Sequence, residues 1–95
     1  MQHKILWLTI ELVAYKHGLT CSGLAKTSGL DPTTFNKSKQ FTPSGAPRWP
    51  SCYTIAKVLN TLNITVADFA YLYGVAEQTY VRKTDKQRPS SSVSA

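Results

Sequence analysis

Two glycines followed closely by helix-capping residues constrain this chain most, because they divide its first part into short helical segments. Gly18 stands two residues before Thr20, and Gly29 stands two residues before Asp31. Glycine readily adopts the left-handed backbone that ends a helix, while threonine and aspartate are good caps for the first turn of the next helix. The pattern therefore predicts a helix before each glycine and a third helix that begins at Asp31, with Pro32 at its first position.

Apolar spacing and two further caps predict the remaining helices. The expected helices are residues 4–17, 21–28 and 31–39, a fourth that Ser51 caps, and a fifth, 66–73, that Thr65 caps and Gly74 ends. Residues 40–50 hold three prolines and a glycine, and we expect them to form an irregular loop. The sequence thus predicts an all-α domain of five helices within residues 1–78.

The last residues, 79–95, lose the apolar pattern of a core and end in a serine-rich run. We expect them to form a disordered, basic tail. Its cations are Arg82, Lys83, Lys86 and Arg88. They fit two interpretations equally, a solubilising linker or a segment that follows a DNA backbone through electrostatic attraction.

The distribution of charge points to an anionic partner. The 95 residues carry 11 basic and 5 acidic side chains, a formal net charge of +6. The sequence has no carboxylate between Asp31 and Asp68, and this window holds Lys37, Lys39, Arg48 and Lys57. A stretch of one sign concentrates positive potential on one part of the surface and attracts a polyanion such as a nucleic acid.

The spacing of the cysteines, histidines and carboxylates and the length of the apolar runs disfavour several function classes. The two cysteines and two histidines match no common zinc-site spacing, so we expect no metal and no cofactor. The carboxylates are scattered and no phosphate-binding glycine loop occurs, which argues against an enzyme. The longest apolar run, residues 5–8, is far shorter than the roughly 20 residues that span a bilayer. With no disulfide framework, a cytoplasmic protein is expected.

Two short helices joined by a tight glycine turn, the second with a polar outer face, form a helix-turn-helix pattern. The run 19–35 resembles the helix-turn-helix of lambda-type phage repressors and related bacterial regulators. The similarity continues through Asn36-Lys37-Ser38-Lys39 and Pro47-Arg48-Trp49-Pro50-Ser51, and it covers roughly residues 10–72. These runs resemble the N-terminal DNA-binding domains of phage-repressor-like and LexA-like regulators. Their self-cleaving peptidase domain has no counterpart in this sequence, so we expect a stand-alone domain or a fragment of a longer regulator, without self-cleavage.

This resemblance implies a sequence-specific regulator of transcription, a repressor that binds a double-stranded DNA operator. It places base contacts at Thr33, Thr34, Asn36 and Lys37, on the first turns of the recognition helix. Asparagine can pair with adenine and lysine with guanine in the major groove. Phosphate contacts are expected from Thr20, Lys39, Arg48, Trp49 and Lys57. Trp49 has a second interpretation, as an anchor that holds the proline-rich loop on the core.

The fifth expected helix carries more aromatic and aliphatic residues than a small core needs. We interpret Phe69, Leu72 and Tyr73 as a candidate homodimer surface, since operators are commonly bound by two-fold dimers. The same excess supports an alternative function, a helical protein-interaction module such as an antitoxin or an adaptor. RNA binding is a weaker option, because the sequence shows no aromatic stacking platform.

Overall fold

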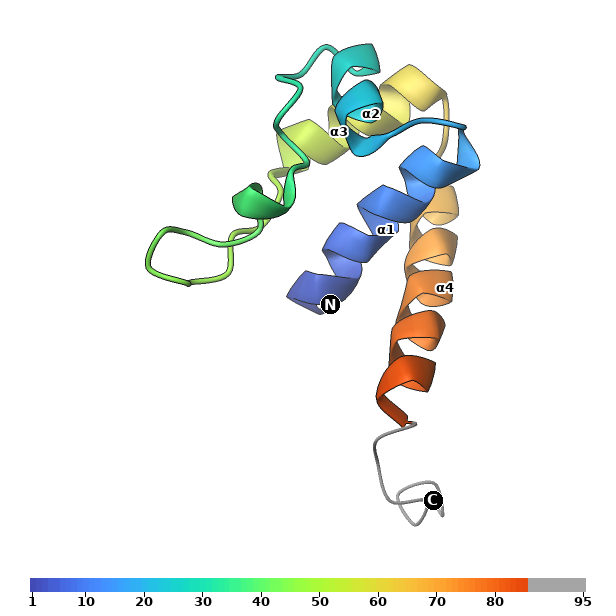
Figure 1. Ribbon diagram of the computed structural model, residues 1–95. Coiled ribbons are helices and arrows are strands. Elements are labelled where there is room, and N and C mark those ends of the chain that lie inside the picture. Colours follow the sequence, from blue (N-terminus) through green and yellow to red (C-terminus); the bar gives the residue numbers. More distant parts are fainter. Residues whose placement is uncertain (86–95) are drawn as a thin grey trace.

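The structure is a computed structural model that describes residues 1–85, with side chains as far as Val81. Its elements are α1 (His3–Lys16), α2 (Cys21–Thr27), the short 3₁₀-helix η1 (Lys37–Lys39), α3 (Cys52–Leu62) and α4 (Val66–Asp85) (Figure 1). All named elements within residues 1–85 are helical, so the predicted all-α class is confirmed for this part of the chain. The prediction of five α-helices is not, because the described residues form four.

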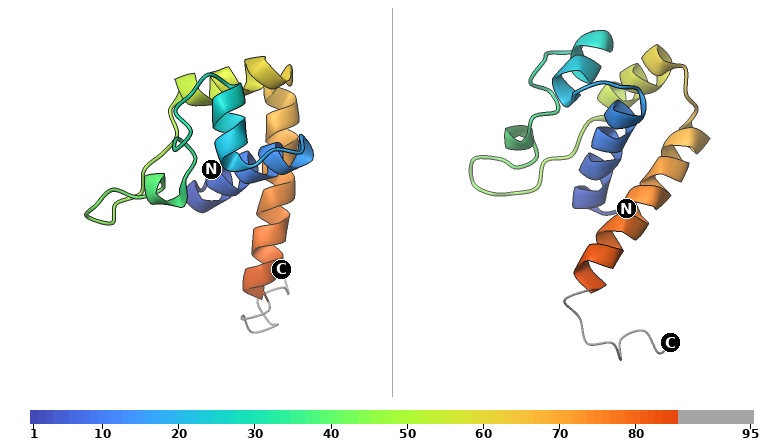
Figure 2. Two further views of the ribbon diagram at one scale, coloured as in Figure 1. Left: turned by 45° about the horizontal axis from the view of Figure 1, so that its top comes forward. Right: turned by 45° about the vertical axis from the view of Figure 1, so that its right-hand side comes forward.

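The helix α1 is the centre of the packing. It lies beside α4 and also packs against α2, and α2 in turn packs against α3 (Figure 2). The core therefore forms where α1, α2 and α3 meet, and α4 covers a further side of α1. Its buried members are Trp7, Ile10, Val13, Ala14, Leu24, Ala25, Phe35 and Val58.

The predicted caps at Thr20, Ser51 and Thr65 are confirmed, whereas Asp31 caps no helix. The Thr20 hydroxyl accepts a hydrogen bond from the Gly23 amide at 2.9 Å and so caps α2. At α4, the Asp68 amide donates to the Thr65 hydroxyl, and the Thr65 amide donates to the Asp68 carboxylate, both at 3.0 Å. This reciprocal arrangement is a capping box, which satisfies two amides that the helix itself leaves unpaired. At α3 the bond runs one way: the Ser51 hydroxyl accepts from the Thr54 amide at 3.1 Å.

The predicted third α-helix is wrong, because residues 31–39 form separate turns. The amides of Thr34 and Asn36 donate to the carbonyls of Asp31 and Thr33, each at 3.0 Å and each across three residues. Asn36 then has an extended backbone, with φ −65° and ψ 151°, before the single turn of η1. An extended residue in mid-segment interrupts any continuous helix.

The composition of this segment explains why no α-helix forms. Threonine, at positions 33 and 34, is β-branched, and the side chains of asparagine and serine, at positions 36 and 38, compete for backbone hydrogen bonds in non-helical conformations, so all four are poor helix formers. Between positions 31 and 39, Phe35 is the only side chain that the core buries. A helix this short depends on packing, and one anchor is too few to stabilise it.

The helix α4 also departs from the prediction, because it continues through Gly74 to Asp85. Glycine in a helix interior costs only about 1 kcal/mol relative to alanine. Leu72, which precedes Gly74, packs against the core, and Ala76, which follows Gly74, is buried. These contacts on both sides of the glycine stabilise the continuous helix. Residues 79–85, predicted as disordered tail, are therefore helical and extend beyond the predicted boundary at 78. The remaining tail, Lys86 and Arg88 included, and the Arg82 and Lys83 side chains lie outside the described residues.

Gly29 lies in a turn and Gly74 in a helix, so replacement by alanine should change stability in opposite directions at the two positions. Gly29 has φ +74°, a left-handed conformation that strains an alanine, so Gly29→Ala should lower the free energy of unfolding by about 1 kcal/mol. Gly74 lies inside α4 with no atom near the position of an added Cβ. Gly74→Ala should therefore raise the free energy of unfolding by about 0.5–1 kcal/mol. Urea denaturation followed by circular dichroism measures both, and a loss of stability in Gly74→Ala would contradict an uninterrupted α4.

Candidate nucleic-acid interface

The proline-rich loop contains a narrow hairpin, residues 41–47, that projects from the helical body (Figures 1 and 2). Phe41 and Pro47 form an antiparallel bridge. Inside it, the Thr42 amide donates to the Ala46 carbonyl and the Gly45 amide to the Thr42 carbonyl, both at 2.8 Å. Gly45 has φ +90°, as is typical of a three-residue hairpin loop that closes on a left-handed glycine. The expectation of irregular structure was thus incomplete, and the Thr-Pro-Ser-Gly run was its sequence signal.

Both ends of the hairpin are attached to α1. The Gln40 carbonyl accepts hydrogen bonds from the Arg48 amide at 2.9 Å and from the His3 imidazole at 2.8 Å. The Arg48 carbonyl accepts from the Trp7 indole at 2.9 Å and lies 3.0 Å from the same His3 Nε2. Since carbonyl oxygens only accept, Nε2 donates to them in the tautomer that carries the proton on this nitrogen; the Trp7 indole nitrogen also lies 3.2 Å from it. Sequence reasoning missed His3 and Trp7, whose only signal is their spacing of four on one helix.

A small aromatic cluster covers this attachment. The His3 ring lies between the rings of Phe41 and Trp49, at centroid distances of 5.0 Å and 5.5 Å. Trp49 is nevertheless 50% exposed, and Phe41 is 47% exposed. Trp49 therefore contacts the protein through His3 while half of its surface stays free for a partner, so neither of its two interpretations is excluded.

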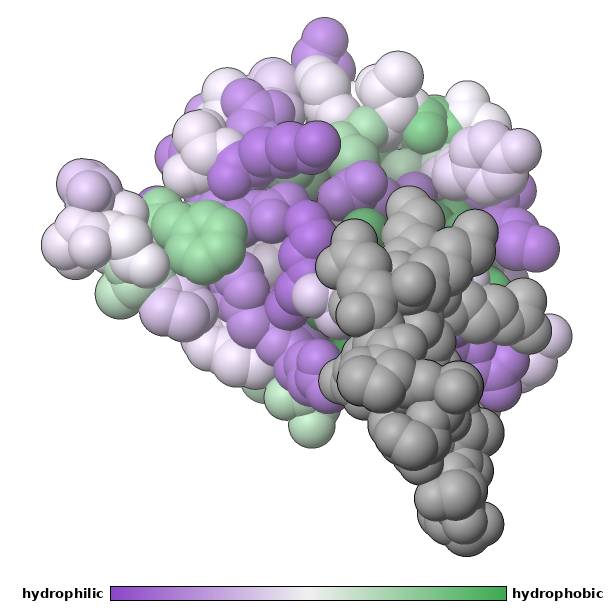
Figure 3. All heavy atoms as spheres, turned by 60° about the horizontal axis from the view of Figure 1, so that its bottom comes forward, coloured by the Kyte–Doolittle hydropathy of each residue, from purple (hydrophilic) through white to green (hydrophobic). Residues whose placement is uncertain are grey.

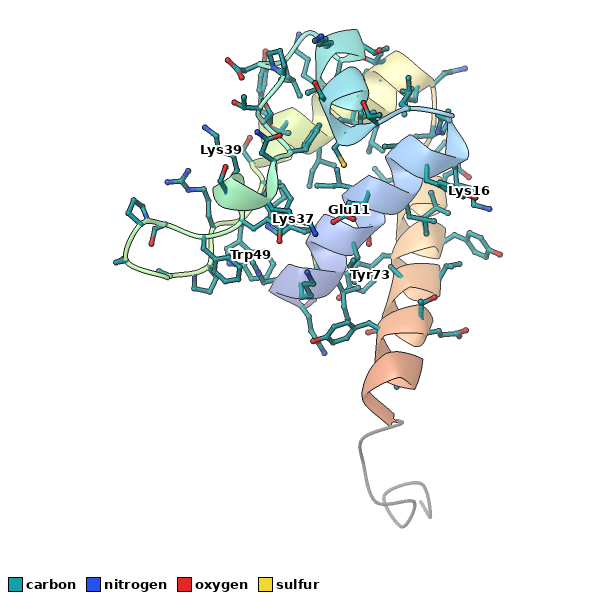
Figure 4. All side chains as sticks on the ribbon, in the orientation of Figure 1. Glu11, Lys16, Lys37, Lys39, Trp49 and Tyr73 are labelled. Carbon is teal, nitrogen blue, oxygen red and sulfur yellow. The ribbon has the colours of Figure 1, made fainter. Side chains whose placement is uncertain are left out.

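Three cations border two adjoining hollows at the base of the hairpin. The smaller hollow has a volume of about 210 Å³ and the larger about 470 Å³, and both are lined by Lys39 and Arg48. Lys37 joins the larger one, and Trp49 the smaller one. None of the residues that line either hollow is acidic. We call the surface formed by Lys37, Lys39, Arg48 and Trp49 the cationic face; Figure 4 shows its two lysines and Trp49 around η1.

The four predicted base-contacting residues lie in one segment, but their side chains differ in whether they form local hydrogen bonds. The Thr33 hydroxyl donates to the Asp31 carboxylate and the Thr34 hydroxyl to the Asp31 carbonyl, each at 2.6 Å, so both protons are used within the turn. Lys37 belongs to the cationic face, Asn36 precedes it in the chain, and both are exposed. The structure thus brings Lys37 to the predicted phosphate-contacting residues, and leaves Thr33 and Thr34 as parts of a local turn.

The predicted phosphate-contacting residues divide into two groups. Lys39, Arg48 and Trp49 come together on the cationic face. Thr20 lies apart from it as the cap of α2. On α3, the Lys57 ammonium lies 5.6 Å from the centre of the Tyr53 ring, a cation–π contact, and Lys57 lines neither hollow.

The candidate dimer residues mostly serve the fold. Phe69 and Leu72 are partly buried against the core. The Tyr73 hydroxyl accepts a hydrogen bond from the Gln2 amide at 2.8 Å, which ties the start of the chain to α4. On the described part of α4, the well-exposed apolar side chains are instead Val66 and Tyr71, at 73% and 72%.

Comparisons with protein-family models, with curated proteins and with solved structures find no match for this chain. Among the residues that the structure describes, no three metal-ligating side chains gather into a group. No described helix has both the length and the apolar character that a bilayer span needs.

The Asp31 carboxylate should titrate below the ordinary aspartate pKa of 3.8. The hydrogen bond from the Thr33 hydroxyl is the main cause of this lowered pKa, followed by that from the Thr33 amide. A lowered pKa means that the charged carboxylate stabilises the turn at neutral pH and that this contribution is lost as the pH falls through the lowered value. Thr33→Val removes the hydroxyl donor, so the pKa of Asp31 should rise toward 3.8 in an NMR titration. An unchanged pKa in Thr33→Val, with Ser38→Ala as the control, would contradict this geometry.

Proposed function

We propose that this chain binds double-stranded DNA through the cationic face and acts as a sequence-specific regulator of transcription, a repressor. The observation that carries the proposal is the convergence of Lys37, Lys39 and Arg48 on two hollows with no acidic lining residue. Cations that share one concave surface follow the phosphates of a nucleic acid backbone better than scattered charges do.

The chemistry of the face suits a DNA backbone in particular. Lysine and arginine neutralise phosphates, and arginine can hold a phosphate with two parallel hydrogen bonds. The half-exposed Trp49 adds an apolar surface on which a sugar can pack. Figure 3 shows many hydrophilic residues, with some apolar patches, on one side of the described surface, and protein–DNA interfaces are likewise polar.

The resemblance to phage-repressor-like regulators supports the same proposal at coarser detail. The Thr20 cap, the short α2 and the left-handed Gly29 fit the first helix and turn of a helix-turn-helix. Asn36 and Lys37 remain available for base contacts. A regulator of this kind works on DNA in the cytoplasm, the compartment that we propose.

Removing single cations should weaken DNA binding in a salt-dependent way. Each phosphate contact releases about one counterion, so Lys39→Ala or Arg48→Ala should lower affinity about eightfold at 0.1 M salt. Each variant should also reduce the slope of log K against log salt by about 1. Fluorescence anisotropy on a labelled duplex at several salt concentrations measures both quantities.

Lys16 provides the matched control for this titration. It lies exposed at the opposite end of α1, away from the cationic face (Figure 4). Lys16→Ala removes the same charge from the protein, so it should change affinity by less than about twofold. Equal losses in Lys16→Ala and Lys39→Ala would mean that net charge alone attracts the DNA, and the proposed site would be abandoned.

A second candidate function, a protein-interaction module, is favoured by a groove between α1 and α4. This groove has a volume of about 590 Å³ and is lined mainly by apolar and aromatic side chains, among them Leu8, Leu12, Tyr15 and Val75. Exposed apolar surface of this kind marks many protein contacts. Because the groove lies away from the cationic face, binding of a protein there is compatible with binding of DNA.

A further inference from the structure

We infer that the 41–47 hairpin is the element that enters the major groove of the DNA, while the cations at its base hold the phosphates on either side. This inference rests on the proposed DNA binding and adds the part of the protein that distinguishes one sequence from another. It moves base recognition from residues 33–37 to the hairpin.

The dimensions of the two segments favour the hairpin. The major groove is about 12 Å wide and admits either an α-helix or a two-stranded ribbon. Residues 31–39 do not form the α-helix that would fill it, since Asn36 is extended between two separate turns. The hairpin is a ribbon of two chain segments joined by the Phe41–Pro47 bridge, and it projects from the body instead of packing on it (Figure 2).

The tip of the hairpin presents groups that match base edges. It carries no charge between Gln40 and Arg48, and residues 43–47 are all exposed. Ser44 offers a hydroxyl that lies 3.0 Å from the Thr42 hydroxyl and has further hydrogen-bonding capacity toward a base, since a hydroxyl has one proton and two lone pairs. Pro43 and Ala46 offer small apolar surfaces of the kind that contact a thymine methyl group. An uncharged tip avoids repulsion inside a groove where neither strand offers a phosphate.

Charges lie where a groove-bound hairpin needs them. Lys37 and Lys39 precede its first arm, and Arg48 follows its second. Both arms of the hairpin therefore have cations at their base. When the hairpin lies in the groove, these cations face the phosphates of the two DNA strands that border it. Phosphate contacts of this kind fix the orientation of the inserted element.

The hairpin is held in place before it meets a partner. Internal hydrogen bonds from the amides of Thr42, Gly45 and Ala46 close its turn, at 2.8, 2.8 and 3.0 Å. The donors of His3 and Trp7 hold the carbonyls at its two ends. A loop that is ordered in the free protein loses less conformational entropy on binding than a mobile one. His3 and Trp7 are thus positioning residues for the DNA-contacting element.

Selection of binding sites from a random duplex pool tests the inference directly. The wild-type chain should select a defined motif, and Ser44→Ala should relax base preference at one or more positions of it, by about five- to tenfold in the relative affinity of the best and the substituted base. Asn36→Ala, selected in parallel, reports on the rival element, and Lys16→Ala should reproduce the wild-type motif.

The outcomes separate the two proposals. If Ser44→Ala selects a different DNA motif from the wild type, the hairpin contacts bases, whether or not Asn36→Ala also changes the motif. A motif that changes in Asn36→Ala and stays intact in Ser44→Ala and Pro43→Ala overturns the inference and leaves the proposed DNA binding in place. Failure of the wild-type chain to bind any duplex overturns both.

The positioning role has its own test in a pair of histidine variants. His3→Ala removes the donor to Gln40, so the amides of Thr42 and Ala46 should exchange with solvent about tenfold faster, and the ratio of specific to non-specific affinity should fall at least fivefold. His17→Ala is the control, because the His17 imidazole bonds the Val13 carbonyl at the far end of α1. Trp7→Phe keeps the buried ring and removes the second donor. Unchanged exchange and unchanged specificity in both His3→Ala and Trp7→Phe would contradict the positioning role.

Discussion

Two N–H groups on one helix hold the surface hairpin to the body of the protein, and the arrangement of the cationic face depends on them. The Trp7 indole donates to the Arg48 carbonyl, and the His3 imidazole lies against the carbonyls of both Gln40 and Arg48. Trp7 is 3% exposed and belongs to the core, so the same side chain packs the helices and positions a surface loop. These hydrogen bonds are at most partly buried. A typical intramolecular hydrogen bond contributes about 0.5–1.5 kcal/mol, which still matters in a domain whose net stability is small.

The attraction of the cationic face for an anion depends on where the acidic residues lie. Glu11 is on α1 and lines the groove against α4, and it lines neither hollow of the cationic face. Asp31, the carboxylate nearest in sequence to Lys37, accepts two hydrogen bonds from Thr33. Its pKa is lowered mainly by those bonds and less by the charge of Lys39. Its charge is thus partly compensated before it can oppose a bound anion.

The sequence was sufficient to predict what depends on local chemistry. The caps at Thr20, Ser51 and Thr65 lie where the side-chain oxygens were expected to accept hydrogen bonds. Apolar spacing and the glycines predicted α1 and α2 to within one residue at each end, and the Ser51 cap predicted the start of α3. The clustering of Lys37, Lys39 and Arg48 was likewise anticipated, as a window without carboxylates, although the sequence did not show which cations share a hollow.

Predictions failed where tertiary contacts outweighed a local preference. The aspartate–proline start at position 31 favours a helix, yet Phe35 is its one buried anchor, and capping alone does not propagate a helix. Gly74 disfavours a helix, yet α4 continues because residues on both sides of it pack on the body. Neither result could be read from the segment itself, since each depends on which side chains find a partner elsewhere.

Tertiary contacts also explain why the proline-rich loop is ordered although most of its side chains are exposed. Its tip is exposed, and its order comes from hydrogen bonds within the turn and from two donors that α1 already presents. Residues 31–39 lack an equivalent set of external donors, so their turns stay separate. In a chain of 95 residues the core is too small to support every surface segment by burial. Directed hydrogen bonds from the buried helix α1 therefore help to fix the shape of the hairpin, and a fixed shape is what recognition of a DNA groove requires.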